Sequence, residues 1–248
     1  MEARKSLLEV FRDRPARFRL LQKGLDQIPM EEVHRIVELG CAYGDASAYL
    51  AERYPCQVTG LDLSEELLAQ ARRTHGAKAG KGELRFCQGD SQNLPAALAP
   101  ADLLVSEAAF SLLPDKEAAV KSAYRVCKEG GRVILNDFAI RLKAQPDERK
   151  RVDFIPCFAG VGQAEEYQEL FEQNGFRTVC LKEVYGELIS ISVWLSKSYG
   201  IPVTEIGSCL VEFFSPEGAC PCKNGNGDFF KNAKLTYVQM IFQKRAGN

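Results

Sequence analysis

The sequence lacks any long hydrophobic run and has almost no excess of either charge. No apolar stretch approaches the roughly 20 residues that a membrane-spanning helix needs. The 248 residues carry 32 basic and 33 acidic side chains, so the net charge of −1 creates no general attraction for nucleic acid or for an anionic membrane. Residues 1–19 contain no apolar signal core. We therefore expect a cytoplasmic protein with no nucleic-acid and no membrane partner.

Histidine is scarce in this chain, whereas cysteine is not. The two histidines, His34 and His75, begin a predicted strand and follow a predicted helix, so we expect structural or surface roles for them. The cysteines number nine, and most of them lie in apolar contexts. An odd number of mostly apolar-flanked cysteines predicts buried free thiols in a reducing compartment, without a disulfide framework.

Strand-like and helix-like patterns alternate along most of the chain. Two short helices are expected within residues 5–28, separated by Pro15. The predicted strands are residues 34–39, 57–62, 84–88, 101–106, 132–137, 177–184 and 235–243. The predicted helices between them are residues 46–54, 65–73, 116–127, 164–174 and 188–199. This alternation predicts an α/β fold with a doubly wound, seven-stranded and mostly parallel sheet, whose last strand is antiparallel.

The chain reads as one domain over residues 1–248, with recognisable parts. The predicted parts are an N-terminal helical cap (1–30), a cofactor-binding core (33–137), a lid insertion (138–163) and a C-terminal half of the sheet (164–248) with a cysteine-rich loop (201–233). The lid prediction rests on a long segment, charged and then apolar, that interrupts the alternation inside a compact domain.

A glycine loop follows the first predicted strand and precedes a helix. Gly40 and Gly44 let the backbone approach a ligand, and Asp62 ends the next apolar run, as in adenosine sites of doubly wound folds. A nicotinamide site would need glycines where Ala42 and Asp45 stand, and Asp45 would repel a pyrophosphate. S-adenosylmethionine has no phosphate and carries a cationic sulfonium, so the acids around this loop favour that cofactor.

Five segments in order resemble the motifs of class I S-adenosylmethionine-dependent methyltransferases. They are residues 38–44, Asp62, residues 89–95, residues 101–106 and residues 124–133, within a resemblance that covers about residues 33–185. Ala42 departs from the family pattern, which usually has glycine there. The resemblance implies a Rossmann-like methyltransferase fold, S-adenosylmethionine as cofactor, Asp62 at the ribose hydroxyls and Asp90 at the adenine amino group. The implied cofactor-binding residues are Glu38, Gly40, Cys41, Ala42, Gly44, Asp62, Leu63, Asp90, Ser91 and Ser106.

The methyl acceptor is expected above the end of the fourth predicted strand, near Ser106 and Glu107. A carbon, oxygen or nitrogen nucleophile often needs a base, and the candidates are Glu107, Asp137 and Asp153. The main hypothesis is therefore methyl transfer to carbon, oxygen or nitrogen of a small metabolite. A non-catalytic S-adenosylmethionine-binding protein is a further alternative.

A second resemblance points to a thiophilic acceptor. Residues 157–167, with Phe171 and residues 174–176, are similar to a segment of arsenite methyltransferases in which a cysteine binds trivalent arsenic. Cys157 matches that cysteine, and Cys209 lies near the offset of a second family cysteine. A third family cysteine, just after the glycine loop, is absent. The resemblance implies the alternative that Cys157 and Cys209 hold an acceptor such as trivalent arsenic.

Cys220 and Cys222 flank one proline in a loop-like stretch rich in glycine and asparagine. Two thiols one residue apart do not easily close a disulfide, but they can share a soft metal ion. We consider three roles for this pair: a metal or metalloid site, a contact with a redox or thiol partner, and a surface loop with incidental cysteines.

Overall fold

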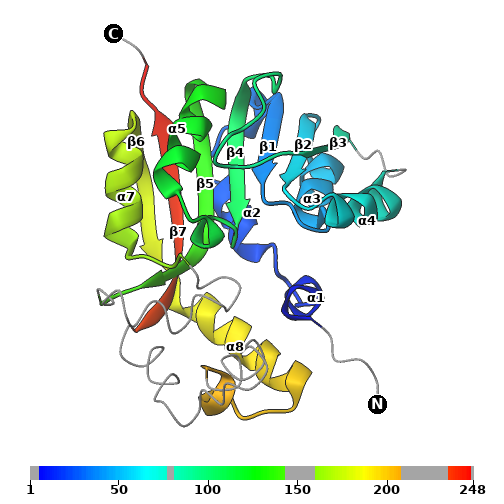
Figure 1. The fold of residues 1–248 in the computed structure, drawn as a ribbon, viewed down its shortest axis with the longest axis vertical. Helices are drawn as coiled ribbons and strands as arrows, with labels where there is room; N and C mark the ends of the chain where they lie inside the picture. Colours follow the sequence, from blue (N-terminus) through cyan, green and yellow to red (C-terminus); the bar gives the residue numbers. More distant parts are fainter. Residues whose placement is uncertain (1–5, 77–80, 143–159, 208–233, 247–248) are drawn as a thin grey trace.

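A seven-stranded mixed sheet forms the centre of the molecule (Figure 1). The computed structural model describes residues 6–76, 81–142, 160–207 and 234–246. The strands are β1 (Arg35–Leu39), β2 (Gln57–Asp62), β3 (Glu83–Gln88), β4 (Ala101–Glu107), β5 (Cys127–Ile140), β6 (Phe176–Glu183) and β7 (Leu235–Lys244). They lie in the order β3-β2-β1-β4-β5-β7-β6, and β7 is antiparallel to both of its neighbours. The predicted α/β fold, including its antiparallel last strand, is confirmed.

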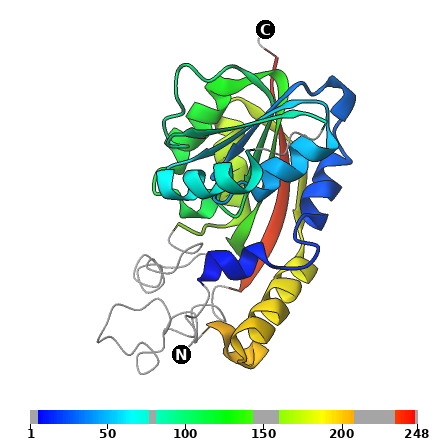
Figure 2. The same ribbon diagram turned by 90° about the vertical axis from the view of Figure 1, so that its right-hand side faces the viewer.

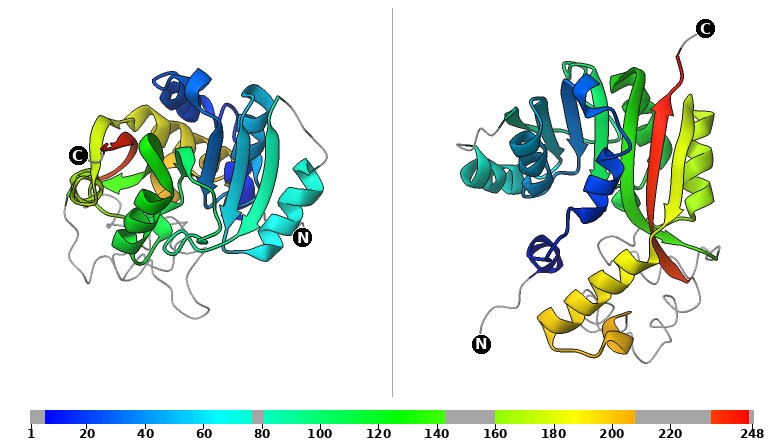
Figure 3. Two further views of the ribbon diagram at one scale, coloured as in Figure 1. Left: turned by 90° about the horizontal axis from the view of Figure 1, so that it is seen from above. Right: turned by 180° about the vertical axis from the view of Figure 1, so that it is seen from behind.

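Helices cover both faces of this sheet (Figure 3). The helices are α1 (Leu7–Arg12), α2 (Arg19–Leu25), α3 (Asp45–Arg53), α4 (Glu65–His75), α5 (Lys116–Val126), α7 (Ala164–Gln173) and α8 (Tyr185–Tyr199). Short 3-10 turns lie at η1 (Met30–Glu32), η2 (Phe110–Leu112) and η3 (Val203–Glu205). Helices α2 and α3 pack Leu21 and Leu50 against one face, and α5 and α7 pack Val120 and Phe171 against the other. Burial of these apolar stripes is what holds the layers together.

Strands β5 and β7 extend past the rest of the sheet, and α1 and α8 pack against this extension (Figure 2). Phe138 and Tyr237 meet edge to face there, with ring centroids 4.9 Å apart. Trp194 of α8 donates a hydrogen bond from Nε1 to the carbonyl of Val10, 2.7 Å away. The extension therefore carries the N-terminal cap at the carboxyl edge of the parallel strands.

The predicted lid begins inside a strand, which differs from the expected boundary. Residues 138–140 continue β5, because Phe138 and Ile140 are buried against β7 and the cap. The carbonyl of Gly162 accepts a hydrogen bond from the Ile140 amide at 2.9 Å, and Val161 is buried. Residues 143–159, most of the predicted lid, lie outside the described residues. Within the described part of the chain, each helix is too short or too polar to cross a bilayer.

Candidate active site

A cavity of about 480 Å³, called here the main cavity, opens at the carboxyl ends of the parallel strands. The loop after β1 contributes Gly40, Cys41 and Ala42, β2 contributes Asp62, and β4 contributes Glu107. Helix α1 covers the cavity with apolar side chains. Open α/β sheets bind ligands at this edge, where the loops of neighbouring strands converge.

The glycine loop is shaped by three residues with left-handed backbone. Gly40, Ala42 and Gly44 have φ values of +74°, +48° and +74°. A Cβ on Gly40 would lie 2.5 Å from the Ala109 Cβ, and one on Gly44 would overlap the Phe86 ring. Of these three loop residues, Ala42 alone carries a Cβ in this conformation, at a cost of roughly 1–2 kcal/mol.

Asp62 closes the loop from the neighbouring strand. Its Oδ2 accepts a hydrogen bond from the Ala42 amide at 2.8 Å, and its Oδ1 accepts one from the Ser64 amide at 2.9 Å. Each carboxylate oxygen keeps a further lone pair that can accept a hydrogen bond from a ligand hydroxyl group. The loop and Asp62 therefore form a cradle that suits an adenosine-bearing ligand without phosphate.

Glu38 lies beneath this cradle and is almost completely buried. Its carboxyl accepts a hydrogen bond from the Ser47 hydroxyl, and burial raises its pKa to about 8. Cys41 also lines the cavity, and burial together with the charges of Glu38 and Asp62 raises the pKa of its thiol. Both groups are therefore protonated at neutral pH, so neither places a full negative charge in the wall.

The structure brings only half of the expected cofactor-binding residues to the main cavity. Glu38, Gly40, Cys41, Ala42 and Asp62 line it. The others do not contribute to its wall, namely Gly44, Leu63, Asp90, Ser91 and Ser106. The Leu63 side chain is 68% exposed, and Asp90 Oδ1 accepts a hydrogen bond from the Gln92 amide at 2.8 Å. The roles proposed for these five residues stay predictions.

Of the two described acids proposed as bases, the structure places Glu107 in the cavity wall and Asp137 outside it. Glu107 Oε1 accepts a hydrogen bond from Asn136 Nδ2 at 2.6 Å, and burial raises the pKa of Glu107 to about 8. Asp137 is fully buried and accepts hydrogen bonds from the amides of Ser111 (2.9 Å) and Phe138 (2.7 Å). Burial raises its pKa to about 6. Asp153, the third candidate, lies outside the described residues.

Three arginines of the N-terminal cap also line the main cavity, and they were not anticipated from the sequence. Arg12 Nε and Arg17 Nη2 lie 3.0 and 3.1 Å from Asp45 Oδ2, and His75 Nε2 lies 3.0 Å from Asp45 Oδ1. Arg14 Nη1 lies 2.5 Å from Glu187 Oε1 of α8. The close spacing of these arginines around Pro15 was the one sequence feature that could have indicated a shared role. Their ionic partners, Asp45 and Glu187, lie far away in sequence.

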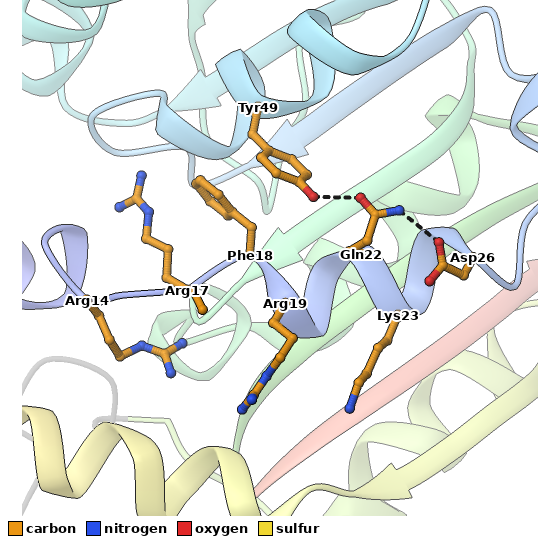
Figure 4. Close-up of a pocket in the computed structure, with 9 residues that line it drawn as sticks. Arg14, Arg17, Phe18, Arg19, Gln22, Lys23, Asp26 and Tyr49 are labelled. Carbon is orange, nitrogen blue, oxygen red and sulfur yellow. Dashed lines mark hydrogen bonds between the residues drawn. The ribbon is translucent and has the colours of Figure 1, made fainter.

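Two of these arginines separate the main cavity from a groove on the outside of the molecule. Figure 4 shows Arg14 and Arg17 along this outer groove, beside Phe18. On its far side, Gln22 accepts a hydrogen bond from the Tyr49 hydroxyl at 2.6 Å. Because Arg14, Arg17 and Phe18 line both spaces, their side chains form the wall between them.

The cysteines proposed as ligands, Cys157, Cys209, Cys220 and Cys222, lie outside the described residues. The described cysteines are free thiols: Cys41, Cys56, Cys127 and Cys180 are buried and Cys87 is half-buried. Within the described ranges, no group of three or more histidine, cysteine or acidic side chains could hold a metal ion. The metal and metalloid hypotheses therefore rest on sequence alone.

Comparison with known proteins agrees with this geometry. A family model described as "Methyltransferase domain" matches residues 36–131. The O-methyltransferase cnsE of Penicillium expansum is 28% identical over 84% of this chain and 73% of that protein. These matches support a class I S-adenosylmethionine-dependent methyltransferase family for this chain. The methyltransferase is thus an enzyme of the transferase class, as predicted.

Other proteins similar to this methyltransferase have names that state different methyl acceptors or reactions. The arsenite methyltransferase of Halobacterium salinarum is 27% identical over 49% of this chain and 31% of that protein. The mycolic acid cyclopropane synthase CmaA1, solved in complex with SAH and CTAB, has a TM-score of 0.69 at 17% identity and covers 97% of this chain and 86% of that one. This structural likeness shows the shared fold, whereas the acceptor has to be argued from the cavity.

Proposed function

We propose that this methyltransferase transfers a methyl group from S-adenosylmethionine to an oxygen of a small, largely apolar molecule, with Glu107 as the base. The observation that carries the proposal is the placement of Glu107, a carboxyl group with its pKa raised to about 8, in the wall of the main cavity. Leu7, Phe11 and Phe138 give this part of the lining an apolar surface, beside the charged Arg14. Its relationship to a fungal O-methyltransferase supports an oxygen acceptor.

Each end of the main cavity has a distinct task. When bound, S-adenosylmethionine supplies a methyl group already activated by its sulfonium. The cradle of Gly40, Ala42 and Asp62 fits the adenosine part, since Gly40 has no side chain to block a close approach and Asp62 offers acceptors to hydroxyls. Glu107 would take the proton of the acceptor hydroxyl while the oxygen lone pair bonds to the methyl carbon. The carbon–sulfur bond would break with its electron pair on sulfur, which leaves S-adenosylhomocysteine and the methylated acceptor. Helix α1 keeps water out, which preserves the alignment that in-line transfer requires.

Arg14 narrows the proposed class of acceptor. Its side chain is only 10% exposed and lines the main cavity, and its Nε atom has no hydrogen-bond partner among the described residues. A buried donor without a partner costs about 1–3 kcal/mol, so a ligand oxygen at this point would be favoured. We therefore expect acceptors that carry a carbonyl or carboxylate oxygen near the hydroxyl, such as 2-hydroxybenzoate, to have a lower KM than phenol. Arg14→Lys keeps the charge beside Glu187 and should remove this difference.

The test uses isotope-labelled S-adenosylmethionine and a panel of phenols, enols, carboxylic acids and amines, with products identified by mass spectrometry. Glu107→Gln should lower kcat for an oxygen acceptor by roughly 10²–10⁴-fold, since general bases contribute that much. Its affinity for S-adenosylhomocysteine should stay within a few-fold of the parent, which controls for folding. Unchanged turnover in Glu107→Gln, or products methylated only on carbon or nitrogen, would contradict the proposal.

The thiophilic alternative is tested in the same assay. Trivalent arsenic is added to the panel in the presence of a thiol, and Cys157→Ser is compared with the parent. The arsenite methyltransferase relative is the observation that keeps this alternative open. Methylated arsenic that disappears in Cys157→Ser would establish it and would remove the need for Glu107.

A further inference from the structure

Three side chains on neighbouring strands are joined by hydrogen bonds beneath the acceptor end of the main cavity. Glu107 of β4 is directly opposite Asn136 of β5, which is directly opposite Gln239 of β7. Asn136 Nδ2 donates to Glu107 Oε1 at 2.6 Å, and Gln239 Nε2 donates to Asn136 Oδ1 at 3.0 Å. Asn136 and Gln239 are 0% and 2% exposed, so water does not compete for these bonds. Gln239 Nε2 also donates to the Leu20 carbonyl of α2 at 2.8 Å.

The direction of this chain follows from the Leu20 carbonyl. A backbone carbonyl can only accept, so Gln239 must turn its NH₂ group toward Leu20 and thereby toward Asn136. Asn136 must then present its oxygen to Gln239 and its NH₂ group to Glu107. The Leu20 carbonyl thus fixes the orientation of both amides, and the last hydrogen bond is donated by Asn136 to the carboxyl group of Glu107.

We propose that Asn136 and Gln239 are positioning residues for Glu107: their amide chain, directed by the Leu20 carbonyl of the N-terminal cap, holds Glu107 Oε1 and leaves Oε2 for the acceptor. This inference rests on the proposed role of Glu107 as base. It adds that the cap does more than cover the cavity, since docking of α2 sets the polarity of the chain that ends at the base.

The other groups near Glu107 oppose its ionisation, which makes the Asn136 hydrogen bond decisive. Burial raises the pKa of Glu107 most, and the Asn136 hydrogen bond lowers it. The charges of Glu38 on β1, Asp137 on β5 and Glu187 on α8 each raise it further. Tyr237 of β7 has its own pKa raised by burial and by the charge of Glu107, and Arg14 pairs with Glu187. Reversing the amide chain should therefore drive Glu107 toward its protonated form.

Gln239→Glu is the substitution that reverses the chain. A carboxylate only accepts, so the Asn136 amide would turn its NH₂ group toward position 239 and its oxygen toward Glu107. Asn136→Asp removes the same donor directly. Gln239→Met removes the hydrogen bonds at similar volume without adding a charge, and it serves where a buried carboxylate prevents folding.

Gln243→Glu is the matched control on the same strand. The Gln243 amide also donates to a backbone carbonyl, that of Gly130 at 2.9 Å, but it lies opposite Arg132 and away from Asn136. It therefore makes the same chemical change on β7 without touching the chain to Glu107.

The experiment is a carbon-13 NMR titration of the full-length protein, with the Glu107 carboxyl signal assigned by its loss in Glu107→Gln. The Glu107 midpoint should rise by about one pH unit or more in Gln239→Glu and Asn136→Asp, a tenfold or greater change in proton affinity, and should also rise in Gln239→Met. It should not move in Gln243→Glu. An unchanged midpoint in folded Gln239→Met or Asn136→Asp overturns the inference, even where stability falls.

The titration requires no turnover, so it is independent of the proposed function. In a parallel assay with an oxygen acceptor, the pH at half-maximal kcat should move with the NMR midpoint while the affinity for S-adenosylhomocysteine is unchanged. If the midpoint moves but turnover does not depend on Glu107, the proposed function fails and the amide chain stands as a structural device only. If turnover depends on Glu107 but the midpoint does not move, the positioning role fails.

Discussion

At the scale of single residues, two carboxyl groups in the cavity wall connect function with pH. Burial raises the pKa values of Glu38 and Glu107 from 4.5 to about 8. Below pH about 4.5 both groups are protonated in the folded and in the unfolded chain. The free energy of unfolding then contains the full contribution of these two groups. Between pH about 4.5 and 8 only the unfolded chain ionises, so this contribution is lost as the pH rises through the folded-state pKa values.

We predict that the free energy of unfolding falls between pH 5 and pH 8 by about 1.4 kcal/mol per pH unit for each of these groups. Urea unfolding at a series of pH values measures this slope. Glu38→Gln and Glu107→Gln should each flatten it, because an amide does not titrate. A slope that is the same in both variants as in the parent would show that these carboxyls ionise normally in the folded protein.

Ala42 carries a cost that glycine would avoid. A φ of +48° is strained for a residue with a Cβ but not for glycine. The greater freedom of glycine in the unfolded chain offsets part of this gain in stability. Ala42→Gly should raise the free energy of unfolding by up to about 1 kcal/mol, measured by urea denaturation. Ala109→Gly is the matched control, since Ala109 lines the same cavity with an ordinary φ of −118° and should lose stability. Equal losses in both variants would contradict the argument from backbone strain.

At the scale of elements, the N-terminal cap depends on a buried ion pair. Arg14 and Glu187 have side chains that are 10% and 6% exposed, with 2.5 Å between Arg14 Nη1 and Glu187 Oε1. Glu187→Ala would leave the Arg14 charge buried without this partner, so we expect a loss of about 3–5 kcal/mol and faster hydrogen exchange in α1. Glu183→Ala breaks the exposed Arg141 pair and should cost less than about 1 kcal/mol. Similar losses in the two variants would show that the cap does not rely on Glu187.

At the scale of the whole molecule, cofactor binding should stabilise the complete fold, because the cradle joins β1 with β2 at the edge where all layers meet. S-adenosylhomocysteine at 100 times its Kd should add about 2.7 kcal/mol, or roughly 5–10 °C in Tm. Asp62→Asn should greatly reduce this shift. Asp26→Asn changes an acid of the outer groove (Figure 4) and should keep it. A full shift in Asp62→Asn would place the cofactor elsewhere.

The order and type of the elements were predictable because their signals are local. The loop from Gly40 to Gly44 and the acid at Asp62 are recognisable within about one βα unit. The end of β5 was not predictable, since the polar residues Asn136 and Asp137 interrupt the apolar pattern. Each of them has a hydrogen-bond partner on another element, Glu107 for Asn136 and Ser111 for Asp137. Asp137 and Glu107 look alike in sequence, yet only Glu107 reaches the cavity.

The sequence by itself determined the doubly wound sheet and the resemblance to methyltransferases, and it predicted the loop and the acid proposed to hold adenosine. Each of these depends on periodicity and on residues a few positions apart. Only the tertiary structure decided what surrounds Glu107. Glu107 meets Asn136 across 29 residues, and Asn136 meets Gln239 across 103 residues. Strand pairing sets these contacts, and the register of β4, β5 and β7 follows from burial summed over the whole sheet, which no single segment encodes.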